Sequence, residues 1–118
     1  QPGVRSVAQV FAHIIGANYF FASKLGGKLP DGVNLETLES TLKTKEAITA
    51  ELKRSIDMAL NTIKNTPDAS LSSKMEMPFP GEYTAMTGIL IILTHTNEHL
   101  GQLIGYARMN KIAPPWSE

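Results

Sequence analysis

Apolar side chains recur at spacings of three and four along three long stretches of this chain, and alternating strand-like patterns are almost absent. The first stretch predicts a helix from about Arg5 to Leu25. Ser6 and Gln9 have the spacing of a capping box, in which each side chain bonds a backbone N–H left unpaired by the first turn. The pair Gly26-Gly27 predicts the helix end, because glycine readily adopts the positive φ that follows many helices.

The second stretch predicts a helix from about Thr44 to Asn65, with Thr44 as its N-cap. We expect this helix to serve packing, because its apolar stripe carries no side chain of the metal-ligating type. The stripe consists of Ile48, Leu52, Ile56, Leu60 and Ile63. The third helix is expected from about Tyr83 to Asn110, beyond which Pro114-Pro115 prevents continuation.

Two connections join these helices. The first spans residues 28–43 and is expected to hold a short helical turn from Asn34 to Glu39. The second runs from about Pro67 to Glu82, and linkers of this length are often functional. Two interpretations stay open for it: a plain surface crossover, or a segment that folds over one end of the helices and shapes a pocket around Met75 to Tyr83.

Three long helices without a sheet indicate an all-α helix bundle, and 118 residues suffice for a single domain over residues 1–118. Three helices bury their apolar faces less completely than four do. We therefore expect a fourth helix, either preceding Gln1 in a longer chain or supplied by another copy in a homodimer. The start at Gln1 rather than Met fits a truncated or processed chain.

The composition narrows the classes of function. Lys plus Arg and Asp plus Glu both number 11, and this zero net charge argues against a nucleic-acid partner. The longest apolar run, Ile89 to Leu93, is far shorter than the roughly 20 residues of a membrane span. Cysteine is absent, which excludes disulfides and thiolate ligands. The localisation stays open between the cytoplasm and export after removal of a signal.

The three histidines carry the most chemical information. His95 and His99 lie four residues apart and project from one face of the third predicted helix, whereas His13 lies on the first. Gly16 and Ala17 leave room about one turn beyond His13. Three imidazoles suit Zn, Ni, Cu or Fe(II) and would leave a coordination position open, as in catalytic zinc sites. The alternative is that each histidine is an ordinary hydrogen-bonded residue.

Other polar residues of these helices are weighed in the same way. Gln102 and Tyr106 share the histidine face, so either could orient a ligand or contact a bound molecule, or simply be a buried polar group bonded elsewhere. Glu98 is misplaced for the general base of an H-E-x-x-H helix, and we expect it to be solvated. Asn18 and Arg108 are expected on the surface.

Two segments resemble a known family. Residues 4–14, with His13, resemble the second-helix signature of the DinB-like superfamily of damage-inducible proteins. Residues 95–108 resemble its last-helix signature: a His pair four apart, then Gly-Gln, then Tyr-x-Arg, here ending at Arg108. The segment Ile112-Ala113-Pro114-Pro115 matches the tail that often follows.

The resemblance implies an up-down four-helix bundle whose first helix would precede Gln1, and a metal site made by His13, His95 and His99. It also implies a divalent transition metal, with Zn or Ni expected ahead of Fe. Some relatives are metal-dependent transferases or isomerases that use low-molecular-weight thiols. We therefore expect a metal-dependent enzyme that activates a thiol or water toward an electrophile, in a transferase or hydrolase-like reaction. The alternative is a non-catalytic, stress-associated module whose metal is mainly structural.

Overall fold

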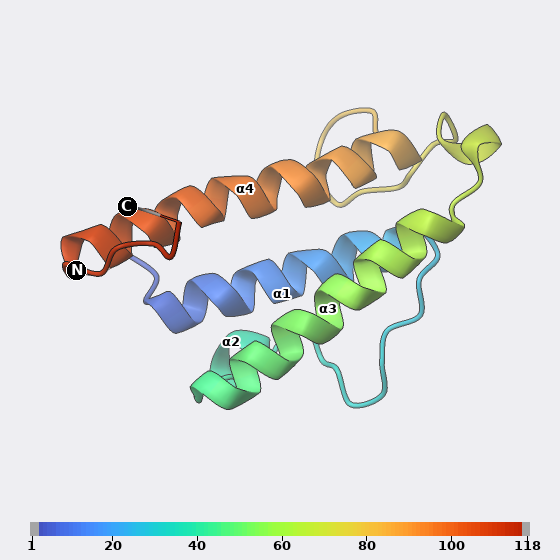
Figure 1. Cartoon of the computed structure of the whole chain (residues 1–118). Helices are drawn as coiled ribbons and strands as arrows, with labels where there is room; N and C mark the ends of the chain where they lie inside the picture. The colour runs from blue at the N-terminus through green and yellow to red at the C-terminus, as the bar shows by residue number, and fades with distance from the viewer. Residues whose placement is uncertain (1–2, 117–118) are drawn as a thin grey trace.

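The computed structural model describes residues 3–116, and within that range it is helical with no strand (Figure 1). The predicted all-α class is therefore confirmed. The elements are α1 (Val7–Lys24), α2 (Leu38–Thr41), α3 (Lys45–Asn65), a 3₁₀ turn (Asp68–Ser70) and α4 (Ala85–Met109). No described helix is long and apolar enough to cross a membrane.

The helix ends follow the local signals in the sequence. The Ser6 hydroxyl accepts from the Gln9 backbone N–H at 3.3 Å, and the Gln9 side chain accepts from the Ser6 N–H at 2.8 Å, which confirms the capping box. Thr44 caps α3 as predicted. The helical turn of the first connection lies later than predicted, because the Asn34 side chain accepts from the Glu36 N–H and holds residues 34–37 in a turn.

Helix α1 lies between α3 and α4, and the chain directions around it are not simply alternating (Figure 1). Asn18 bonds Ser55 of α3, and Gly27, just beyond α1, lies against Thr62 near the end of α3, so α1 and α3 run parallel. Residues 25–44, which connect α1 to α3 in the sequence, carry the chain back along the molecule before α3 begins. Helix α4 runs antiparallel to α1, since Tyr106 near its end bonds Arg5. The predicted bundle thus holds, but strict up-down alternation does not apply between α1 and α3.

The core lies mainly on α1. The buried cluster joins Ile15 and Tyr19 of α1 to Leu38 of α2. Asn18 is only 3 % exposed and donates to Ser55, so the expectation that it lies on the surface was wrong. The spacing of residues along α1 could not reveal this burial, because the partner of Asn18 is Ser55, a fully buried residue on a different helix.

The apolar stripe of α3 only partly serves packing. Ile48 is buried against α1, whereas Ile56 and Leu60 are 39 % and 61 % exposed. The face of α3 that packs on α1 is rotated toward the small residues Ser55 and Ala59. The predicted packing role therefore holds for the first turns of the stripe and fails for its middle.

Helix α4 is the least buried of the long helices. Its one buried residue is Gly88, on which the buried Met75 of the second connection lies. Several large apolar side chains of α4 are exposed: Met86, Leu90, Leu93 and Leu100. Our expectation of a fourth helix or a homodimer stays a prediction. The burial of Met75 against Gly88 supports the interpretation that the second connection folds over one end of the helices.

Candidate metal centre

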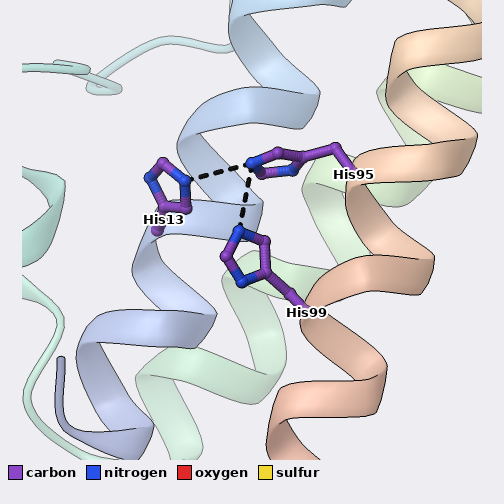
Figure 2. Close-up of side chains that lie close together, drawn as sticks. All are labelled: His13, His95 and His99. Carbon is purple, nitrogen blue, oxygen red and sulfur yellow. Dashed lines mark hydrogen bonds between the residues drawn. The ribbon is translucent and has the colours of Figure 1, made fainter. Parts of the chain in front are cut away.

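The three histidines converge where α1 faces α4. Figure 2 shows His13 reaching from α1 toward His95 and His99, which project from successive turns of α4. The Nε2 atom of His95 lies 3.0 Å from Nε2 of His13 and 3.2 Å from Nε2 of His99. The prediction that these three residues meet is confirmed, although His13 lies more than 80 residues from the other two along the chain.

These separations fit a single small cation. Two nitrogens bound tetrahedrally at 2.0–2.1 Å lie roughly 3.3 Å apart, close to the two Nε2 distances. One ring nitrogen from each histidine falls within 4.8 Å of the others, and all three side chains are partly buried. The centre also contains only imidazole nitrogens, the ligand type that suits Zn, Ni, Cu and Fe(II).

The outer nitrogen of His99 is held by α4 itself. Gln102 donates through Nε2 to the Tyr106 hydroxyl at 2.9 Å, and that hydroxyl donates to the Arg5 carbonyl at 3.1 Å. This assignment leaves Gln102 Oε1 as the acceptor 2.8 Å from His99 Nδ1. His99 then carries its proton on Nδ1 and presents an unprotonated Nε2 to the centre. Gln102 therefore orients the His99 ring, and Tyr106 orients Gln102.

The outer nitrogen of His13 faces a carboxylate that sequence reasoning missed. Glu39 Oε1 lies 4.0 Å from His13 Nδ1 and 3.4 Å from Arg5 Nε. Such a carboxylate favours a proton on Nδ1 and again frees Nε2 for a ligand role. Glu39 lies in α2, within a connection, and no local sequence pattern links it to His13. Only the return of the chain through residues 25–44 brings it there.

His95 faces the Nε2 atoms of both other rings with its own Nε2 atom. Its Nδ1 is buried and has no hydrogen-bond partner among the described residues. A proton on His95 Nε2 could be donated to only one of the two neighbouring Nε2 atoms. Hydrogen bonds alone therefore cannot pair all three facing nitrogens. A cation between them would satisfy all three at once, which favours a metal site over three ordinary hydrogen-bonded histidines.

The electrostatics keep two of the rings neutral. Burial lowers the pKa of His13 below its ordinary value, and the Arg5 charge lowers it further. Burial is also the main cause that lowers the pKa of His95, followed by the neighbouring His99 and His13. Neutral imidazole is the form that binds a metal.

The remaining candidates lie outside the centre. Glu98 is exposed, as expected, and Arg108 is exposed near the end of α4. Gly16 and Ala17 line a hollow of about 420 Å³ that opens beside His13 and His95, so the predicted room near His13 exists. Pro78 and Phe79 of the second connection line the same hollow, as predicted for a segment that shapes a pocket.

Comparison with known proteins agrees with this geometry. No match was found among curated proteins. The sequence model of the DinB superfamily matches residues 1–103, a span that includes all three histidines and Gln102. Since the match covers most of the 118 residues, the chain belongs to the DinB superfamily.

Proposed function

We propose that this protein binds a divalent transition metal through His13, His95 and His99. The observation that carries the proposal is the convergence of three Nε2 atoms from two helices, two pairs of them 3.0 and 3.2 Å apart. The Gln102 oxygen 2.8 Å behind His99 and the Glu39 carboxylate 4.0 Å behind His13 support it, because both favour a proton on Nδ1 and leave Nε2 free to coordinate. Zn or Ni are the expected ions, with Fe as a further candidate.

The ligand set favours a catalytic role over a closed structural site. Three protein ligands leave a position for an outside molecule, whereas structural zinc sites usually have four. A divalent ion in this centre would supply a Lewis acid that lowers the pKa of a bound thiol or water, producing a nucleophile at neutral pH. The proposed reaction is transfer of a low-molecular-weight thiol to an electrophile, or a hydrolase-like attack by water.

The chain's own residues would orient ligands and shape the approach of the substrate. Gln102 holds the His99 imidazole from behind, the Glu39 carboxylate faces that of His13 at 4.0 Å, and the hollow beside His13 offers room for a small molecule. Within the described part of the chain, Glu39 is the only carboxylate that lines this hollow. Arg5 pairs with Glu39 and keeps its carboxylate next to His13, which favours a role for Glu39 in positioning the His13 ring.

One observation favours the alternative, a mainly structural metal. Helix α4 buries only Gly88 within the described residues, so its packing on α1 is thin. A metal that joins His13 of α1 to His95 and His99 of α4 would convert binding free energy into folding free energy. In this case chelation would lower the melting temperature strongly, without any thiol-dependent turnover.

The two proposals are separated by one set of assays. Metal-free protein is titrated with Zn²⁺ and Ni²⁺, and the loaded protein is incubated with small thiols and a chromogenic electrophile. Turnover that requires both metal and thiol, and that is lost in His99→Ala, supports the enzyme. A filled site with no turnover across the panel, and a large fall in melting temperature on chelation, supports the structural alternative. Failure to bind Zn²⁺, Ni²⁺ and also Fe²⁺ contradicts both proposals.

A further inference from the structure

The hollow beside the histidines is apolar apart from its histidine end. It lies between α1, α2, α4 and the second connection, and has a volume of about 420 Å³. His13 and His95 form part of its wall, with Glu39 next to them. Its other walls are mostly hydrocarbon, including Ala17, Phe20, Leu35, Leu38, Phe79 and Ile91.

Small residues of α1 keep this space open. A Cβ atom at Gly16 would lie 3.7 Å from a methyl group of Leu38, and Ala17 leaves the next position short. Aromatic rings border the opening: the Phe20 ring centroid lies 5.3 Å from that of Phe21 and 6.4 Å from that of Phe79. Phe79 is 51 % exposed, so much of its ring is available to a ligand.

The size and chemistry of the hollow limit what fits. Its volume is near the lower end of the roughly 300–1,000 Å³ of small-molecule pockets. Burial of hydrocarbon against these walls is favourable, and an aromatic group also gains from edge-to-face contact with the rings. Among residues 3–116, Glu39 is the only acidic side chain of the wall, and no lysine or arginine lines it. Two cations lie next to wall residues: Arg5 pairs with Glu39 at 3.4 Å, and Lys24 Nζ lies 5.6 Å from the Phe20 ring centroid. An anionic ligand group would meet the Glu39 carboxylate and would have to compete with it for Arg5, so the wall favours an uncharged group.

We infer that the hollow binds the uncharged apolar portion, an aryl or short alkyl group, of a small ligand whose donor atom lies at the histidines. The substrate class is thus a compact hydrophobic molecule with a single metal-binding group. A large thiol with several charges would occupy the solvent side of the site. The donor end of this inference rests on the proposed metal site, whereas the apolar end requires only the hollow.

Two thiols that share a donor and differ in their tails test this directly. Phenylmethanethiol and 2-mercaptoethanol are titrated into Co²⁺-loaded protein, and the thiolate-to-cobalt absorption reports binding. Burial of a phenyl group is worth about 1.5–3 kcal/mol, so phenylmethanethiol should bind roughly tenfold to a hundredfold tighter. A second arm uses metal-free protein and benzyl alcohol, with NMR shifts of the Leu38 and Ile91 methyl groups, which line the hollow, as the readout.

Matched variants locate the binding. Phe79→Ala removes an exposed wall residue, and Ala17→Leu fills the hollow. Each should weaken the binding of phenylmethanethiol at least fivefold and leave the binding of 2-mercaptoethanol unchanged. Leu93→Ala is the control, because Leu93 is similarly exposed, at 60 %, but lies outside the hollow. Equal affinity for the two thiols, or equal effects of Phe79→Ala and Leu93→Ala, would overturn the inference.

The arms separate this inference from the metal proposal. If neither Co²⁺ nor the proposed ions Zn²⁺, Ni²⁺ and Fe²⁺ bind, the metal proposal fails, and the benzyl alcohol arm alone decides the inference. Shifts confined to residues that line the hollow and lost in Ala17→Leu would then support it. Absence of such shifts at millimolar benzyl alcohol would overturn it.

Discussion

Replacement of Gln102 by leucine tests whether its amide holds His99 in the metal-binding orientation. Gln102 Oε1 lies 2.8 Å from His99 Nδ1 in a partly buried position. In the metal-bound protein the His99 Nδ1–H would lose this acceptor, whereas in the metal-free protein the ring can change tautomer or rotate. The loss should therefore fall mainly on the metal-bound state and appear as weaker metal binding.

The size of the effect follows from the bond that is removed. Leaving a partly buried donor without its acceptor costs about 1–3 kcal/mol. Removal of the residue behind a ligating histidine typically lowers metal affinity about 10–100-fold, which corresponds to roughly 1.4–2.7 kcal/mol. We expect Gln102→Leu to raise the Kd for Zn²⁺ within this range, as measured by competition with a chromophoric chelator at pH 7.5.

Three further variants make the result specific. Gln102→Glu keeps an acceptor opposite His99 and should restore most of the affinity. Tyr106→Phe removes only the group that orients the amide and should have a smaller effect. Asn97→Ala changes an exposed polar residue of the same helix and should have none. Unchanged affinity in Gln102→Leu, or an equal loss in Asn97→Ala, would refute the role of Gln102.

Three other predictions concern the stability of the metal-free protein. Burial lowers the pKa of His13 and His95 below 6.5, so the unfolded chain takes up protons first as the pH falls below that value, and the folded state loses stability. Thermal melts between pH 8 and 5 should show this decline in melting temperature. The decline should be smaller in the variant in which both histidines are changed to Gln. Asn18→Ala should lower the free energy of unfolding by about 1–3 kcal/mol in urea titrations, because it removes a buried bond to Ser55; no change would contradict it. Gly27→Ala should lower the free energy of unfolding by about 1–3 kcal/mol, because the new Cβ would lie 2.9 Å from the Ala22 carbonyl oxygen. Gly105→Ala is the control and should be tolerated, because a Cβ there meets nothing within 4 Å.

The parts of the structure that could be predicted depend on local patterns. The capping pair Ser6 and Gln9 and the N-cap Thr44 involve residues three positions apart, so the sequence alone determines them. The shared face of His95 and His99 follows from helical periodicity in the same way. The meeting of these two with His13 needed more: the family signatures supplied it, and helix spacing alone left it open.

The parts that were missed depend on how the chain returns in space. Glu39 faces His13 only because residues 25–44 run back before α3 begins, a path without periodicity to reveal it. Burial of Asn18 depends in the same way on Ser55, 37 residues later. The exposure of Leu60 was missed because an apolar stripe specifies a helix face and not what covers it.

The central claim is that His13, His95 and His99 form one metal-binding centre, and metal content tests it most directly. Protein purified without a metal-affinity step is compared by elemental analysis with His95→Ala, the variant that removes the ring whose Nε2 faces both others. We predict stoichiometric Zn or Ni, or else Fe, in the wild-type protein and near-complete loss in the variant. Wild-type protein that holds no transition metal, even after incubation with Zn²⁺ and Ni²⁺, or equal metal content in both proteins, would contradict the claim.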